Sequence, residues 1–236
     1  MIRFQLYDDS GQYRESERGW VYSTLMAIGG FYGAFTYSIR GGVFCNAQTA
    51  NFVLFAMAVG DAHWSKALYY LIPMTAYFLG AFLTELAFTS PRWKFPIHWE
   101  TALIAIEMGI VVVLGLIPES APYQISQVIV NFMCSMQYNT FRAAQGIPMA
   151  TTFCTNHLRQ TGIACCKAIR SGDAKDRRRM FCHLGMIAVF VLGGIVATVL
   201  CRRFQGRAIW ATLIPLGILL VYLIRADLAQ SRETVS

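Results

Sequence analysis

Two groups of uncharged hydrogen-bonding side chains stand at the start of apolar segments in this sequence. One opens the stretch "QTANFVLFAMA" at residues 48–58, and the other opens "TTFCTNHL" at residues 151–158. Hydroxyl and amide groups at a helix start can accept from its free amide donors, so both groups are expected to cap discontinuous helices. The positive end of the helix dipole also attracts an anion. The sequence therefore predicts two helix N-termini that hold an anion or the polar end of a solute. The predicted binding residues are Gln48, Thr49, Asn51, Thr151, Thr152, Thr155, Asn156 and His157.

The pattern around the two polar groups indicates an internal repeat. Residues 29–53 align with residues 135–159 at a fixed offset of 106, which superposes the two groups. In both copies a helix ends in a glycine-containing run, "SIRGGVF" or "AAQGIPM", before the polar group begins. Farther along, "FLGAFL" at 78–83 resembles "VLGGIV" at 191–196. A duplicated ancestor explains this plan, which gives the two groups equivalent places.

Each polar group also has a structural alternative. Ser, Thr and Asn side chains often bond to neighbouring helices inside membranes, and a single group would favour that role. Two groups in matching positions leave a binding site and a structural role as equally supported explanations.

The composition places the chain in a lipid bilayer. Hydrophobic residues make up 56% of it and charged residues only 14%, and the mean hydropathy is +0.44. Six apolar stretches are about long enough to cross ~30 Å of hydrocarbon as helices. The sequence predicts an all-α polytopic membrane protein with two internal repeats, six full transmembrane helices and two shorter or discontinuous membrane segments. The six stretches are 20–39, 67–88, 101–117, 122–141, 183–201 and 208–224, and the two shorter ones are 43–60 and 147–166.

The distribution of basic residues predicts the orientation. Seven Lys and Arg lie in one connection, residues 159–179, which the positive-inside rule places in the cytoplasm together with the N-terminus. If both short segments re-enter, the inner side holds fifteen basic residues and the outer side five; if all eight segments cross, the counts are thirteen and seven. The charge rule therefore favours re-entry, which also makes the repeats inverted. The expected organisation is an N-terminal cytoplasmic tail over 1–19, repeats over 20–117 and 122–225, and a C-terminal tail over 226–236.

Two glutamates fall at membrane depth, where ionisable side chains are costly and usually face the protein interior. Glu107 lies near the centre of "TALIAIEMGIVVVLGLIP", and Glu85 lies near the end of "AFLTELAF". Glu107 fits a proton relay or cation partner if it faces a cavity, and otherwise a neutral acid bonded to a neighbouring helix. The seven cysteines and four histidines show no metal-ligand spacing, so we expect no metal or cofactor.

The runs at 29–55 and 135–158 and the glutamate-bearing fourth segment resemble the YoaK-like family of bacterial multi-pass inner-membrane proteins, which carry a domain of unknown function. The resemblance covers nearly the whole chain and implies a multi-helix integral membrane protein. This chain departs from the family at Gly33-Ala34, where Asp-Ala is usual. It departs again at Thr49-Ala50-Asn51 and Thr155-Asn156-His157, where Thr-Gly-Asn and Thr-Gly-Thr are usual. In plan, the chain is also similar to sulfate and uracil permeases, in which two half-helices meet at the substrate.

These observations predict a small transporter or permease of the cell inner membrane. Its expected partners are the bilayer and an unidentified anionic or polar solute, with a homodimer left open and nucleic acid not expected. The alternative is a non-transporting scaffold or assembly protein whose basic cytoplasmic loop meets a partner or lipid. An enzyme is not expected, because no nucleophile and base pair can be identified in the sequence.

Overall fold

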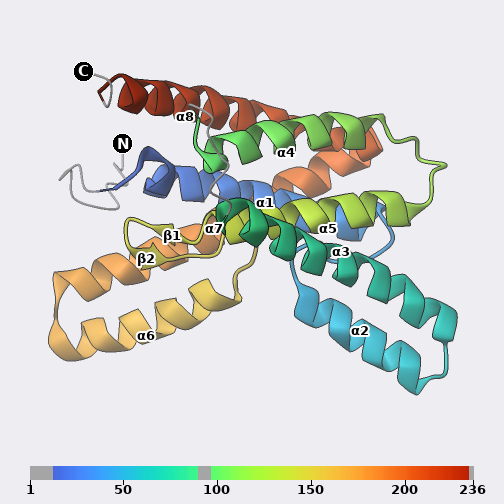
Figure 1. The fold of residues 1–236 in the computed structure, drawn as a ribbon. Helices are drawn as coiled ribbons and strands as arrows, with labels where there is room; N and C mark the ends of the chain where they lie inside the picture. The colour runs from blue at the N-terminus through green and yellow to red at the C-terminus, as the bar shows by residue number, and fades with distance from the viewer. Residues whose placement is uncertain (1–12, 90–96, 234–236) are drawn as a thin grey trace.

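The computed structural model describes residues 13–89 and 97–233, and this part of the chain is almost entirely helical (Figure 1). This confirms the predicted all-α fold class. The described part contains the α-helices α1 (Gly19–Ile39), α2 (Gln48–Gly60), α3 (Trp64–Thr89), α4 (Trp99–Leu116), α5 (Tyr123–Thr140), α6 (Thr155–Ser171), α7 (Ala174–Phe204) and α8 (Leu213–Glu233), the 3-10 helices η1 (Glu15–Glu17) and η2 (Gln205–Thr212), and the paired strands β1 (Ala143–Ala144) and β2 (Ile147–Pro148).

The two short membrane segments become helical later than their hydropathy suggests. Gly41 and Gly42 have φ angles of 82° and 71°, a conformation open mainly to glycine, and the chain stays non-helical until α2 begins at Gln48. The second segment begins with β2, the second strand of the β1–β2 hairpin, and stays non-helical until α6 begins at Thr155. In each case an irregular stretch leads into the helix, because glycines or a hairpin turn interrupt the helical backbone.

Glycines allow the central helices to pack backbone against backbone. A β-carbon on Gly193 of α7 would stand 1.9 Å from the carbonyl oxygen of Ala27 on α1, and one on Gly30 would stand 2.0 Å from that of Phe190. A β-carbon on Gly80 of α3 would stand 2.6 Å from the carbonyl oxygen of Phe132 on α5. Small residues at such crossings are typical of membrane helices. The pairs α1–α7 and α3–α5 therefore form the closely packed centre.

The helices α2 and α6 begin near the middle of the molecule and run toward opposite ends (Figure 1). Each forms a hairpin with the next helix along the chain. The α2 helix returns as α3 after a turn in which Ala62 has a φ of 57°, and α6 ends at Gly172 with a φ of 68°. The Asp173 side chain then caps α7 by accepting from the Lys175 amide at 2.9 Å. These hairpins place both helix starts at the centre.

Three stretches of the described chain are helical, long and apolar enough to cross a membrane. They are Trp64–Ala87, Trp99–Leu116 and the run Ala174–Ser231, which contains α7, η2 and α8. The chain is therefore a membrane-embedded helical protein, but these criteria do not identify all six predicted spans. Helices α1 and α5 bury much of their surface within the protein, and α5 carries buried polar groups such as Gln127 and Asn131. Helices shielded from lipid need not be strongly apolar.

Candidate functional site

Side-chain amides form hydrogen bonds with the backbone that leads into α2. Gln48 Nε2 donates to Oδ1 of Asn131 on α5 at 2.8 Å and to the backbone oxygen of Cys45 at 3.2 Å. Asn51 Nδ2 donates to the backbone oxygen of Phe44 at 2.7 Å, and Asn51 Oδ1 accepts from the Phe44 amide at 3.2 Å. These bonds satisfy the irregular stretch that leads into α2, which lipid would leave without partners. Gln48 and Asn51 thus stabilise the approach to the helix.

The predicted helix capping by these polar groups is wrong at both sites. The N-cap residue of α2 is Ala47 and that of α6 is Cys154, and neither makes a side-chain bond to the first turn. Asn51 shows the physical reason, because its amide faces back to the irregular backbone at Phe44 instead of the helix amides. Before α2, hydrogen bonds to the irregular backbone therefore occupy the amide group that capping would need, whereas before α6 the buried hydroxyls of Thr151 and Thr152 have no hydrogen-bond partner among the described residues.

His157 is fully buried and ties α6 to its neighbours. Its Nε2 lies 2.8 Å from the carbonyl oxygen of Ala150, and its Nδ1 lies 3.0 Å from Nδ1 of His183 on α7. A carbonyl oxygen can only accept, so His157 carries its proton on Nε2 and its Nδ1 accepts from the Nδ1 proton of His183. Both ring nitrogens of His157 are thus engaged within the protein, and this predicted binding residue does not line the pocket described next.

The starts of α2 and α6 line one pocket of about 460 Å³. Thr49, whose side chain is exposed, comes from the first start, and the exposed Thr155 comes from the second. Of the other predicted residues, Gln48 and Asn156 also line it. The fully buried Asn51, Thr151 and Thr152 do not. The structure thus brings together four of the eight predicted residues, from segments that lie far apart in the sequence.

The pocket contains an arginine that the sequence analysis placed only in the basic run. Arg159 lies one helical turn after Thr155, and its guanidinium donates to Asn156 Oδ1 at 3.2 Å. Spacing alone could have indicated it, because residues i and i+4 share one face of a helix. Tyr77 from α3 and Asn46 also line the pocket; Asn46 stands two residues before the first polar group, whereas nothing in its local sequence marks Tyr77. Hydroxyls, amides and one guanidinium at two helix N-termini form a surface suited to an anion.

A second, smaller pocket of about 260 Å³ adjoins the first, because Asn156 lines both. Arg142 and Tyr138 are among its other lining residues. The Tyr138 ring contacts that of Phe153, which lines the first pocket, with ring centroids 4.8 Å apart. An aromatic pair and one asparagine therefore lie between the two hollows.

The two predicted intramembrane glutamates have different surroundings. Glu107 is fully buried on α4, and its Oε1 accepts from the Tyr32 hydroxyl of α1 at 3.0 Å. Its Oε2 has no hydrogen-bond partner among the described residues. Glu85 is exposed and forms an ion pair with Arg142. Only Glu107 is therefore enclosed as predicted, and neither glutamate lines the pocket between the helix starts.

Comparison with known proteins places the chain in a family. The family described as a protein of unknown function, DUF1275, matches residues 21–224. The chain belongs to the DUF1275 family. This membership agrees with the resemblance to YoaK-like proteins of unknown function. Searches of curated proteins and of solved structures give no match. The long apolar helices support a membrane protein and the family assigns no activity, so function must be argued from the site.

One of the positions at which this chain differs from YoaK-like proteins, Gly33, lies next to a residue of the pocket, Asn46. A β-carbon on Gly33 would stand 2.9 Å from Nδ2 of Asn46, which donates to the Gly29 carbonyl at 2.9 Å. Where YoaK-like proteins have Asp, this chain thus has Gly33, and the neutral side-chain amide of Asn46 packs against it. The formal charge of the pocket lining comes from Arg159 instead. Within residues 13–89 and 97–233, no cluster of three or more His, Cys, Asp or Glu could hold a metal ion.

Proposed function

We propose that this protein is a small membrane transporter or permease for an anionic solute, bound between the starts of α2 and α6. The observation that carries the proposal is the shared pocket, in which Thr49 and Thr155 come from two separate helix starts. A volume of about 460 Å³ lies within the range typical of small-molecule sites. Irregular backbone at membrane depth also requires protein or a wet cavity around it, and a pocket here supplies such a cavity.

The charge of the pocket favours an anion over a neutral solute. Both helix dipoles place their positive ends at the pocket, and Arg159 adds a full positive charge. A guanidinium also offers paired donors, which match carboxylate and phosphate groups. The second pocket, beyond Tyr138 and Phe153, then serves as a vestibule on the side of the basic connection.

The proposed topology has six crossing helices, two re-entrant helices and inverted repeats. Its support is the packing of equivalent glycines, because Gly80 and Gly193 occupy matching places in "FLGAFL" and "VLGGIV". Gly80 packs α3 against α5, and Gly193 packs α7 against α1 in the same manner. The opposite directions of α2 and α6 in Figure 1 also fit an inverted pair. With the basic connection in the cytoplasm, the proposed location is the inner membrane.

A scaffold role is the second candidate, favoured by a specific observation. Neighbouring protein groups accept or donate the hydrogen bonds of Gln48, Asn51 and His157, as expected of residues that only hold helices together. The transporter proposal rests on Thr49, Thr155 and Arg159, which line the pocket. The two candidates therefore differ in whether these three residues act on a ligand.

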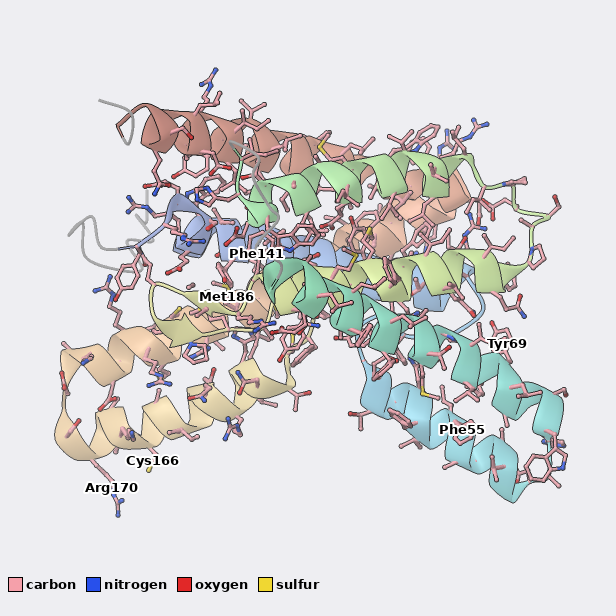
Figure 2. The ribbon with its side chains drawn as sticks, in the orientation of Figure 1. Phe55, Tyr69, Phe141, Cys166, Arg170 and Met186 are labelled. Atoms are coloured by element: carbon pink, nitrogen blue, oxygen red, sulfur yellow. The ribbon has the colours of Figure 1, made fainter. Side chains whose placement is uncertain are left out.

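A ligand screen with a matched arginine control tests the proposal. Purified protein in detergent is heated with a panel of small carboxylates, phosphates, sulfate and neutral metabolites. We expect at least one anion to raise the melting temperature, and Arg159→Gln to abolish most of that rise. Arg170→Gln is the control, because Figure 2 shows Arg170 on the same helix but far from the centre. No stabilising anion, or equal effects of the two variants, would favour the scaffold.

A further inference from the structure

A third pocket, also basic, lies at the end of the molecule remote from residues 167–179. It has a volume of about 500 Å³ and is lined by the end of α4, the turn after it, the end of α7 and the start of η2. The α7 helix has 31 residues and so is about 46 Å long, which separates its two ends by more than the hydrocarbon thickness. This pocket therefore cannot share the surface of the basic connection.

The pocket carries two arginines whose charge is not balanced by an ion pair in the described part of the chain. Arg203 and Arg207 line it, both are exposed, and neither has an ion-pair partner within residues 13–89 and 97–233. Basic residues are ordinarily concentrated on the cytoplasmic side, so two of them at the opposite end of α7 call for a local partner.

The one carboxylate in the pocket lining is already neutralised. Glu119 Oε2 accepts from the guanidinium of the buried Arg40 at 3.0 Å, and Glu119 Oε1 accepts from the Gly206 amide at 2.7 Å. Glu119 is therefore committed to Arg40 and the backbone. The pocket presents its remaining positive charge to whatever enters it.

Part of the pocket lining is apolar and lies where a membrane span ends. Leu116 is the last residue of the candidate span Trp99–Leu116, and Leu116 and Phe204 both line the pocket while remaining exposed. A ligand here meets two guanidinium groups and hydrocarbon-facing side chains together. That combination matches a phosphate with acyl chains attached better than a small hydrophilic ion.

We propose that this pocket binds the phosphate of an anionic phospholipid headgroup, held by Arg203 and Arg207 with its chains along Leu116 and Phe204. The site is independent of the pocket between α2 and α6. Zwitterionic lipids carry the same phosphate but add a cation that the two arginines repel. The site therefore prefers a headgroup with net negative charge, such as phosphatidylglycerol.

Native mass spectrometry of delipidated protein in non-ionic detergent tests the proposal. Phosphatidylglycerol and phosphatidylcholine are titrated separately, and we expect the first to bind about fivefold more tightly. Arg203→Gln and Arg207→Gln should each weaken phosphatidylglycerol binding about fivefold, the size expected for a partly exposed ion pair. The matched control is Arg202→Gln, because Arg202 is also exposed at the end of α7 but does not line the pocket, and its effect should stay below about twofold.

Two further arms keep the result decisive. Arg203→Lys retains the charge and should recover part of the lost affinity, which separates lost binding from lost folding. Equal losses in all three glutamine variants would overturn the proposal, because they would indicate general attraction to a basic surface. Displacement of phosphatidylglycerol by millimolar inorganic phosphate would overturn the assignment to a lipid.

Discussion

Two neighbouring glycines on α7 are predicted to respond to alanine with opposite signs. In Gly193→Ala the new β-carbon would stand 1.9 Å from the Ala27 carbonyl oxygen, whereas ordinary contacts begin near 3.4 Å. Helices α1 and α7 must therefore separate by about 1.5 Å, and overpacking of this kind costs about 3 kcal/mol. Alanine regains about 1 kcal/mol through its higher helix propensity, which leaves a net loss of about 2 kcal/mol.

Gly194→Ala is the control, because its β-carbon would lie 3.6 Å from the nearest atom, the Gly30 carbonyl oxygen. Only the gain in helix propensity remains at this position, so we expect stabilisation of up to about 1 kcal/mol. Thermal unfolding in detergent micelles, followed by tryptophan fluorescence, measures both variants. Similar shifts for the two, or a stable Gly193→Ala protein, would refute the close crossing of α1 and α7.

Three further predictions concern the Arg40–Glu119 ion pair, the buried Glu107 and the orientation in the membrane. Glu119→Gln should lower the unfolding free energy by about 2 to 3 kcal/mol, because Arg40, which is 1% exposed, loses its counter-ion. Arg40→Met should lower it less, because the remaining Glu119 is 51% exposed and can be solvated. Unfolding measurements on both variants check this order. Glu107→Gln keeps the oxygen that accepts from Tyr32, so its unfolding free energy should stay within about 1 kcal/mol, and a larger loss would show that the acid itself is required. In a cysteine-free background of intact cells, Ser171→Cys should resist an impermeant thiol reagent and Ser120→Cys should react; the reverse pattern would invert the proposed orientation.

Hydropathy predicted the helices well because lipid imposes a simple rule of length and apolarity. The stretch 101–117 lies close to α4, which ends at Leu116, and 122–141 lies close to α5. The rule failed where backbone geometry takes over from side-chain polarity. Residues 43–47 are apolar enough for a helix, yet the glycines before them keep this stretch irregular.

The candidate site was predictable as two polar helix starts, but the roles of its members were not. His157 bonds to His183, 26 residues away, and only the fold brings these rings together. Asn51 was expected to cap α2 but bonds to Phe44, because the irregular approach needs partners at the same depth. Arg159 was counted as part of a basic loop, although its spacing from Thr155 places both on one helical face.

A double-mutant cycle on Thr49 and Thr155 tests the central claim most directly. Thr49→Val and Thr155→Val each remove one hydroxyl from the shared pocket while nearly preserving volume. With a stabilising anion from the screen, titrated calorimetrically, each change should weaken binding by about 1 to 3 kcal/mol. The double variant should then be non-additive, because both hydroxyls act on one ligand. Unchanged anion affinity in both single variants would contradict a binding site between the two helix starts.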